Sequence, residues 1–302
     1  MIRKIVVTTG SRSEYGILKP VLNSIIASKK LKLYLVVAGM HLSKEHGLTI
    51  NEIIRDGYKI HAKVKMVPKG NSNYDMAMSL GYGIIQFSDI FKKIKPDVNL
   101  ILGDRDEVFA SALAASHMNI PNAHIHGGDR SQAGIDEYNR HAITKISNIH
   151  FTASKKSMQR VIRLGENPKY VFHTGSPSID EIYSNNITDR NDLEKKYNIK
   201  MTGKEILLVY HPVTTQIDES TKTIKNILKS IAKFKTTTIV IAPNSDAGHK
   251  FIVKSLNSFY NSHDFVRLYK NIPRADYLGL LKNCAVLIGN SSSGFIEAPY
   301  FY

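Results

Sequence analysis

Residues 98–117 read VNLILGDRDEVFASALAASH, and this stretch predicts the architecture of the chain. Val98–Leu102 is almost entirely apolar and does not alternate, as is typical of a strand buried on both faces. Gly103–Arg105 supplies a turn, and Glu107–His117 has the apolar spacing of a helix. A buried strand, a turn and a helix form the unit from which parallel α/β sheets are built.

The same alternation runs through the first part of the chain. Near-continuous apolar strands again indicate a doubly wound parallel sheet with both faces covered. Further strands are expected at Lys4–Thr8, Lys32–Ala38, Ala62–Val67, Asn122–Ile125, Ile149–Thr152 and Val171–His173, with helices at Ile17–Ser28, Ala77–Ile94 and Lys155–Leu164.

A second α/β unit is expected in the remainder. The 302 residues exceed one ordinary core, and the polar stretch 184–203 indicates a boundary. We predict an N-terminal Rossmann-like domain over residues 1–175 and a C-terminal one over 176–302, with a cleft between them. The strands of the C-terminal domain are expected at Glu205–Tyr210, Thr237–Ala242, Phe265–Leu268 and Ala285–Ile288, and its helices at Lys222–Phe234, Ala247–Phe259 and Arg274–Asn283.

Composition excludes several classes of protein. The net charge is +15, but the lysines are scattered and form no basic arm, so nucleic acid is not a favoured partner. No apolar run reaches the ~20 residues needed to span a bilayer. The single cysteine, Cys284, excludes disulfides and cysteine-rich metal sites, fits a reducing cytoplasmic compartment, and lies in an apolar run that predicts a buried, inert thiol.

The loops after the strands of the first half carry polar residues. Arg12 and Ser13, in a glycine- and serine-rich turn before a helix, suit an anion. His41 follows the second strand, although a single histidine is more often structural. Asp104 and Arg105 combine a carboxylate with a guanidinium, whereas Asp106 and Glu107 are expected to complement the dipole of the next helix.

A second polar cluster follows the strand Asn122–Ile125. The spacing of His124 and His126 would place both imidazoles on one face of a strand, where they could bind a metal ion, but no third ligand has diagnostic spacing. Asp136, Glu137, Arg140 and His141 come shortly after and open a helix. These groups titrate or bind anions.

The loops of the second half resemble a nucleotide site. His211 follows one strand, and Asn244 and Asp246 follow the next. Residues 289–294, GNSSSG, combine hydroxyls with the amide donors of a helix start, a combination that cradles phosphate. Glu297, one turn further, is placed to hold ribose hydroxyls. The simple interpretation is a nucleoside diphosphate bound by the second domain.

Together these loops resemble the UDP-N-acetylglucosamine 2-epimerases, in particular the hydrolysing branch that forms N-acetylmannosamine for sialic acid and related sugars. The matching motifs occur in order along the whole chain, and the runs RHAITK and HPVTT are specific. They are residues 10–15 (GSRSEY), 39–42 (GMHL), 103–105 (GDR), 124–128 (HIHGG), 140–145 (RHAITK), 211–215 (HPVTT), 243–248 (PNSDAG) and 289–294 (GNSSSG).

The resemblance implies a GT-B-like fold, dimers or tetramers, and no redox cofactor or obligatory metal. It implies that UDP is expelled from sugar C1 to give a glycal, which water then attacks as C2 is inverted. Catalysis is assigned to Asp104, His126, Asp136 and His211. UDP-sugar binding is assigned to Arg12, Ser13, His41, Arg105, Glu137, Arg140, Asn244, Asp246, Ser291, Ser292, Ser293 and Glu297.

The sequence departs from the family pattern in two places. Many members have glutamate at the position of His126, so either an imidazole does that work here or the role passes to Asp136 or Glu137. The chain also stops at Ala298–Tyr302, in what should be the first turn of a helix, and relatives continue further. We therefore expect that the sequence is truncated and its second domain incomplete.

Other functions stay open at this point. The substrate could be UDP-N-acetylglucosamine or UDP-2,4-diacetamido-2,4,6-trideoxyglucose. A non-hydrolysing epimerase would return UDP to C1, and a GT-B glycosyltransferase would pass the sugar to an acceptor, although transferases rarely need so many acid–base groups. A non-catalytic basic binding protein is the alternative from a different class, and salt-dependent retention on nucleic acid without UDP binding would support it.

Overall fold

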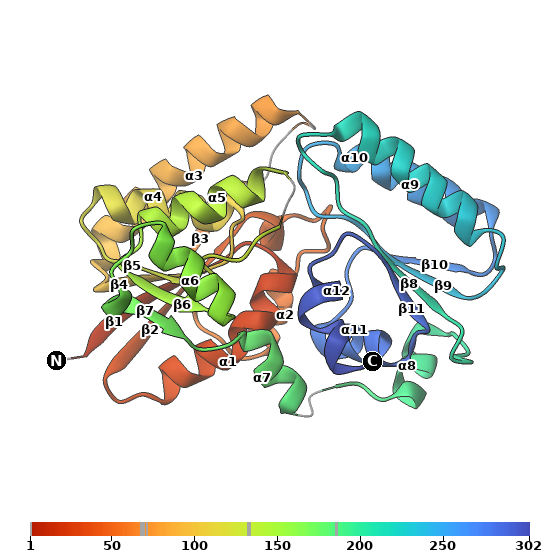
Figure 1. Ribbon diagram of the computed structural model, residues 1–302, viewed down its shortest axis with the longest axis horizontal. Coiled ribbons are helices and arrows are strands. Elements are labelled where there is room, and N and C mark those ends of the chain that lie inside the picture. Colours follow the sequence, from red (N-terminus) through yellow and green to blue (C-terminus); the bar gives the residue numbers. More distant parts are fainter. Residues whose placement is uncertain (1, 67–69, 71, 132–133, 185–186) are drawn as a thin grey trace. The chain divides into compact units, whose positions relative to one another are not determined.

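The computed structural model describes residues 2–66, 70, 72–131, 134–184 and 187–302. The chain divides into two compact units. The first consists of residues 1–69 and 74–180, and the second of residues 70–73 and 181–302. Each unit is built on a parallel β-sheet of its own (Figure 1). This confirms the predicted fold class, α/β with two Rossmann-like units.

The sheet of the first unit has seven parallel strands, one for each predicted strand. They are β1 (Arg3–Thr9), β2 (Leu31–Ala38), β3 (Ile60–Val64), β4 (Val98–Leu102), β5 (Asn122–Ile125), β6 (Ile149–Thr152) and β7 (Val171–His173). The spatial order is β3-β2-β1-β4-β5-β6-β7, so the order reverses between β1 and β4. Such a switch point is where open α/β sheets bind ligands. Val67, predicted in the third strand, lies outside the described residues.

Helices cover both faces of this sheet, as the apolar strands predicted. Val7 of β1 packs with Leu18 and Leu22 in one buried cluster, whereas Val6 packs with Phe87 and Phe91 in another. Figure 1 shows α1 and α2 on the first of these faces and α3, α4 and α5 on the other. The helices are α1 (Arg12–Ala27), α2 (Ile50–Arg55), α3 (Asn73–Ile94), α4 (Asp106–His117), α5 (Gly134–Lys145) and α6 (Lys155–Arg163), with 3₁₀ turns η1 (Gly39–Leu42) and η2 (Pro168–Tyr170). Helix α7 (Pro177–Tyr183) spans the division of the chain between residues 180 and 181.

The second unit repeats the design on a smaller scale. Its strands are β8 (Ile206–Val209), β9 (Thr238–Ile241), β10 (Val266–Tyr269) and β11 (Val286–Gly289), in the parallel order β10-β9-β8-β11. The switch point therefore lies between β8 and β11. Its helices are α8 (Arg190–Tyr197), α9 (Ile217–Ile231), α10 (His249–Ser262), α11 (Arg274–Asn283) and α12 (Ser293–Ile296), followed by the 3₁₀ turn η3 (Ala298–Tyr300).

Three short helices, α2, α7 and α8, were not predicted. In α2, Ile50 and Ile53 are buried, but six residues are too few to show a helical period. Helix α8 lies within the polar stretch 184–203, and its Leu193 is fully buried in the core of the second unit. A helix with a single buried apolar residue has no periodic signal, which is why the sequence did not predict it. Because Leu193 packs in that core, much of the stretch 184–203 belongs to the second unit.

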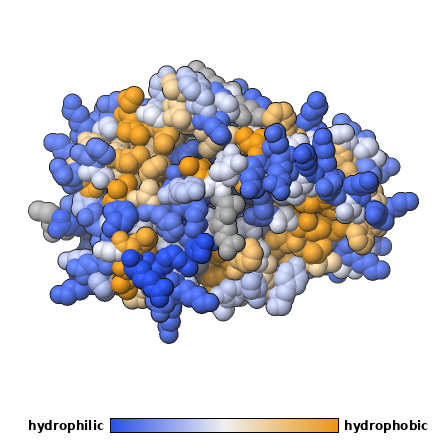
Figure 2. Space-filling view, turned by 45° about the horizontal axis from the view of Figure 1, so that its top comes forward, coloured by the Kyte–Doolittle hydropathy of each residue, from blue (hydrophilic) through white to orange (hydrophobic). Residues whose placement is uncertain are grey.

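The surface of the molecule and the environment of its single cysteine agree with what the composition indicates. Figure 2 shows hydrophilic residues over much of the visible face, with hydrophobic surface in separate patches. Cys284 is buried, as predicted, and burial raises the pKa of its thiol to about 12. Within the described ranges, no helix combines the length and the apolar character that crossing a bilayer requires.

Candidate active site

The turn after β1 begins the polar region of the first unit. Ser11 caps α1, and the Glu14 carboxylate accepts hydrogen bonds from the backbone N–H of Gly10 and of Ser11, at 3.1 and 2.9 Å. This capping box holds the turn rigidly. Arg12 lies in the first turn of α1 and its Nε donates to Glu52 Oε2 at 2.7 Å, whereas Ser13 is exposed.

A buried carboxylate, Glu107, lies beside this turn. It is 3 % exposed and pairs with Arg105, with 3.3 Å between Arg105 Nε and Glu107 Oε2. Gly39 has a φ of +54°, and a Cβ there would lie 2.0 Å from Glu107 Oε1, so only glycine fits. The sequence predicted that Glu107 would merely complement a helix dipole. The structure instead makes it the buried counter-ion of Arg105.

Glu14 shares this environment. Burial raises the pKa of its carboxyl to about 7, Arg105 opposes the rise, and Glu107 adds to it. Two buried carboxylates beside one guanidinium cannot both ionise without a free-energy cost. The end of β1 therefore contains a carboxyl group that titrates near neutral pH.

His41 lies between the side chains of Thr9 and Thr49. It is fully buried, with Nε2 3.0 Å from Thr9 Oγ1 and Nδ1 2.8 Å from Thr49 Oγ1. Burial lowers the pKa of its imidazole to about 3, so it stays neutral at physiological pH. Because the His41 side chain is fully buried and its imidazole is neutral, we propose that it supports the neighbouring loops and does not itself contact substrate.

Arg140 connects the two polar loops that follow β4 and β5. Its Nη2 donates to the Asp104 carboxylate, and its Nη1 donates to the backbone carbonyl of His126 at 3.2 Å. Its Nε is buried and has no hydrogen-bond partner among the described residues. The structure thus brings together Asp104, His126 and Arg140, three residues selected from the sequence, at the carboxyl ends of neighbouring strands.

The Gly103 turn that presents Asp104 is fixed by His124. The Nε2 of His124 donates to the Gly103 carbonyl at 2.8 Å, and its Nδ1 lies 3.2 Å from Thr144 Oγ1. Burial lowers the pKa of His124 to about 3. This neutral imidazole is therefore a donor that shapes the turn.

His126 has a different environment, which corrects the prediction of two imidazoles on one face. It lies beyond the end of β5 with a φ of +67°, and this left-handed conformation breaks the strand alternation. Its Nδ1 is 2.7 Å from Asp129 Oδ2, and its Nε2 is 2.9 Å from Ser176 Oγ. Burial raises the pKa of Asp129, but hydrogen bonds from His126 and Ser157 outweigh this and hold it below its usual value.

Asp136 and Glu137 lie in the first turn of α5, as predicted. Glu137 accepts a hydrogen bond of 2.6 Å from the Ser131 N–H, and its other oxygen lies 3.2 Å from His141 Nε2. Burial raises the pKa of Glu137, but the bonds from Ser131 outweigh this and lower it. Glu137 therefore holds the start of α5.

In the second unit, polar residues gather around the switch point between β8 and β11. The Asn290 side chain accepts from the His211 N–H at 2.8 Å and donates to the His211 carbonyl at 2.9 Å. The Asn244 N–H donates to His211 Nδ1 at 3.3 Å, and the Asn244 side chain contacts Asp246 at 2.5 Å. Since Nδ1 accepts, the proton of a neutral His211 lies on Nε2.

The serine-rich loop after β11 is partly exposed. Ser291 is partly exposed and Ser292 is exposed, while Ser293 is buried and its N–H donates to Ser291 Oγ at 3.3 Å. Helix α12 spans only four residues, because Pro299 cannot continue its hydrogen-bond pattern. Its dipole is therefore small, and any phosphate binding here would depend on hydroxyls and individual amide groups.

Glu297 is buried in an ion-pair network. It is 3 % exposed, and its Oε1 accepts from Arg274 Nη2 at 2.8 Å. Arg274 also donates from Nε to Glu181 Oε2 at 3.1 Å. In this structure one oxygen of Glu297 is therefore committed to Arg274.

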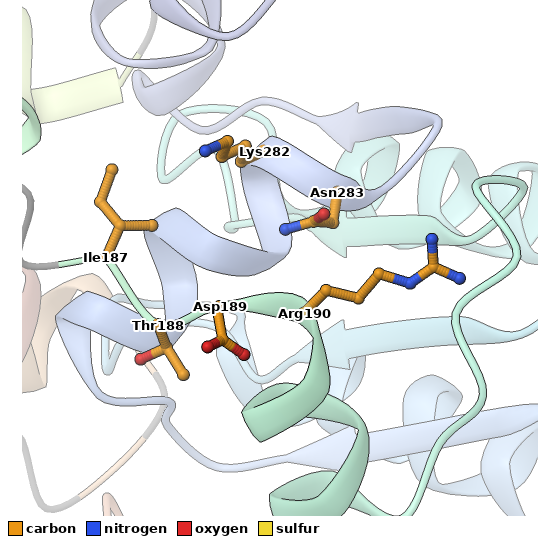
Figure 3. Close-up of a pocket in the computed structure, with 6 residues that line it drawn as sticks. All are labelled: Ile187, Thr188, Asp189, Arg190, Lys282 and Asn283. Atoms are coloured by element: carbon orange, nitrogen blue, oxygen red, sulfur yellow. The ribbon is translucent and has the colours of Figure 1, made fainter.

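One cavity of about 200 Å³ lies elsewhere in the second unit (Figure 3). None of the predicted site residues lines it. Its polar groups have structural roles: Thr188 Oγ1 donates to Asp276 at 2.6 Å, the Asp189 side chain caps α8, and Arg190 donates to the Met201 carbonyl. We assign no ligand to it. Within the described ranges, no cluster of three or more histidine, cysteine or carboxylate side chains could hold a metal ion.

Comparison with known proteins gives consistent matches. The sequence model of the family described as UDP-N-acetylglucosamine 2-epimerase matches residues 23–302. The chain is 38 % identical to the UDP-N,N′-diacetylbacillosamine 2-epimerase (hydrolyzing) of Legionella pneumophila, over 100 % of this chain and 79 % of that protein. It is 37 % identical to the polysialic acid biosynthesis protein P7 of Escherichia coli, over 99 % and 76 %.

The fold is also similar to that of a solved structure. This is the crystal structure of UDP-GlcNAc 2-epimerase from Neisseria meningitidis bound to UDP-GlcNAc, with a TM-score of 0.78 and 19 % identity. The similarity covers 95 % of this chain and 78 % of that one. At this identity the likeness concerns the fold alone, and it agrees with the predicted α/β fold of GT-B type.

Proposed function

We propose that this chain, which belongs to the UDP-N-acetylglucosamine 2-epimerase family, is a hydrolysing 2-epimerase. It would convert a UDP-linked 2-acetamido sugar into UDP and the free 2-epimer. The observation that carries the proposal is the cluster in the first unit, where Arg140 contacts both the Asp104 carboxylate and the His126 carbonyl. The name of the L. pneumophila relative supports the hydrolysing reaction.

The chemistry explains why acid–base groups are needed. The hydrogen on C2 of the sugar is not acidic, because C2 has no neighbouring carbonyl group. As the C1–O bond breaks, UDP leaves with its electron pair and positive charge develops at C1. A base can then remove the C2 proton, and the C2–H electrons form the C1–C2 double bond of a glycal. Water adds at C1, and a proton returns to the other face of C2.

We assign the proton transfers to groups of the first unit. Asp104 and Asp136, with His126, are the candidates for the base and the acid; each positioned group of this kind contributes roughly 10²–10⁴-fold. Arg140 holds the Asp104 carboxylate, and its buried Nε is suited to a substrate oxygen. Arg105 and Arg12 supply positive charge, although each is paired with a glutamate in this structure.

We assign UDP binding mainly to the second unit. The Nε2 proton of His211 would donate to the departing diphosphate, which stabilises the charge that develops on it. Asn244, Asp246 and the hydroxyls of Ser291 and Ser292 would complete the nucleotide site. Ser293 and Glu297 are buried, so their contribution would be to hold this loop.

Two substrates compete. UDP-N-acetylglucosamine is favoured by the description of the family, and UDP-N,N′-diacetylbacillosamine, a UDP-2,4-diacetamido-2,4,6-trideoxy sugar, is favoured by the L. pneumophila relative. The test is to incubate the chain with each substrate, without acceptor, and to follow products by ¹H NMR. UDP and a free 2-epimer from either substrate would support the proposal. A UDP-bound epimer, or no reaction with either substrate, would contradict it.

Two further properties belong to the proposal. We expect a dimer or tetramer, which light scattering coupled to size-exclusion chromatography would measure. We also place the reaction in the cytoplasm, where nucleotide sugars are made. The single cysteine of the chain leaves no internal disulfide to form, which suits a reducing compartment.

A further inference from the structure

We propose that Asp129 is a positioning residue that fixes the tautomer of His126 and makes Nε2 the atom that exchanges a proton. This inference rests on the proposed function, because it concerns how an imidazole acts as the base or acid of that reaction. Asp129 was not among the residues selected from the sequence. It directly follows the glycines of the HIHGG motif, and it gains its role only from the way this loop folds back.

The hydrogen bonds of His126 determine where its proton lies. Nδ1 is 2.7 Å from Asp129 Oδ2, and an ionised carboxylate only accepts hydrogen bonds, so Nδ1 carries the proton. In a neutral imidazole Nε2 is then an acceptor, and Ser176 Oγ lies 2.9 Å from it. Ser176 Oγ is also 2.6 Å from Ser178 Oγ, so the Ser178 hydroxyl can donate to Ser176 while Ser176 donates to Nε2.

The carboxylate is itself held in place. The Ser157 hydroxyl, in the first turn of α6, donates to the second oxygen of Asp129. Gly128 has a φ of +78°, and a Cβ there would lie 2.4 Å from the Ser157 carbonyl oxygen. The loop can therefore lie directly against α6 only with glycine at this position. The His126 side chain is 7 % exposed and that of Asp129 23 %, so the pair is partly screened from water.

This geometry gives the imidazole a defined function in the elimination step. When the sugar binds, the Ser176 hydroxyl must turn away from Nε2. The C2 proton then moves to Nε2 while the C2–H electrons form the C1–C2 double bond and the C1–O electrons leave with UDP. His126 becomes an imidazolium whose Nδ1–H still points at Asp129, and the negative carboxylate stabilises the new positive charge. The same relation between an aspartate and a histidine orients the general base of serine-protease triads. An aspartate–histidine pair would thus replace the single glutamate.

Asp129→Asn tests the proposal, because an amide can donate to Nδ1 and so favour the other tautomer. We expect kcat to fall about 10²–10⁴-fold with little change in KM. In ¹⁵N-histidine NMR, the His126 proton should lie on Nδ1 in the unaltered chain and on Nε2 in the variant. His126→Gln identifies the signal, and Asp89→Asn, at an exposed position of α3, is the matched control. A purely structural role for Asp129 would not move the proton between the ring nitrogens.

The outcomes separate this proposal from the proposed function. A proton on Nε2 of His126 in the unaltered chain, or unaltered kcat in Asp129→Asn, would overturn the role of Asp129. If Asp129→Asn does not fold, Asp129→Glu keeps the carboxylate, and the tautomer of the unaltered chain decides. If the chain does not release UDP from any nucleotide sugar tested, the proposed function is contradicted. The NMR measurement would still decide the tautomer of His126 in that case.

Discussion

The polar residues at the two switch points are held in different ways. In the first unit they are linked by side chains from separate segments, as when Arg140 contacts both Asp104 and His126. In the second unit the loop after β11 is largely exposed, and Asn290 reaches the backbone of His211 from the surface. The first site is therefore cross-linked by side-chain contacts, whereas the second is open.

This difference matches the chemistry that we assign to each unit. Proton transfer requires groups held within a fraction of an ångström, so it demands a connected network. Binding a diphosphate requires donors to the anion, which hydroxyls and backbone amides can supply from an open loop. Substitutions in the first unit should therefore reduce turnover strongly, and those in the second unit should have smaller effects.

The largest effect is expected at Asp104. Asp104→Asn removes a candidate proton carrier and the charged partner of Arg140, so kcat for UDP release should fall about 10²–10⁴-fold. Steady-state kinetics of UDP release would measure it, with Asp89→Asn as the control. Turnover close to that of the control would remove Asp104 from the mechanism and break the contrast between the units.

His211→Ala should have the next largest effect. Loss of one donor to a developing charge typically costs about 10²–10³-fold, so UDP departure should slow by that factor. Hydration of the isolated glycal should continue at nearly the normal rate, because no UDP leaves in that step. Equal impairment of both steps would show that His211 does more than assist the leaving group.

Glu14→Gln should change how stability depends on pH. Burial raises the pKa of Glu14 from 4.5 to about 7. The folded state therefore binds this proton more tightly than the unfolded state, and the stability it contributes is present below pH 4.5 and lost as pH rises through about 7. The free energy of unfolding lost in this way is at most about 3 kcal/mol.

Urea unfolding of the chain and of Glu14→Gln at pH 5 and pH 8 would measure this effect. The variant should lose less stability than the unaltered chain over this interval, and the exposed Glu45→Gln should behave like the unaltered chain. An identical pH dependence in all three would mean that Glu14 titrates normally.

The smallest effect is expected at Ser292. This side chain is exposed, and one neutral hydrogen bond contributes about 0.5–1.5 kcal/mol, so Ser292→Ala should weaken UDP binding by roughly 2–10-fold. Calorimetric titration with UDP would measure it, with unchanged unfolding as evidence of an intact fold. A loss of UDP affinity of about 10²-fold or more would show that the loop is more ordered around UDP than its exposure indicates.

The sequence predicted the sheets well because most of their strands are apolar runs, and those in the middle of each sheet are buried. Val98–Leu102 and Asn122–Ile125 occur at the predicted residues. It also placed Asp104 and His126 in polar loops and Arg140 near the start of a helix, and the structure brings the three together. Helices α2 and α8 were missed because each is short and its burial depends on contacts from other elements.

What the sequence could not predict were partners that depend on tertiary packing. Glu107 looked like a dipole complement, because its proximity to Gly39 arises only when β2 and β4 lie in one sheet. Asp129 carried no pattern beyond its position after two glycines, and the left-handed conformation of His126 is what turns the imidazole towards it. A polar residue after HxHGG is the one local signal that could have indicated it.

The most direct test of the account is the reaction in D₂O. Removal and return of the C2 proton by side chains of the first unit predicts that the free 2-epimer carries deuterium at C2, which ¹H NMR and mass spectrometry detect together with released UDP. A free sugar that retains its hydrogen and its original configuration at C2 would show simple hydrolysis of the sugar–UDP bond. That result would contradict the proton-transfer role assigned to Asp104, Asp136 and His126.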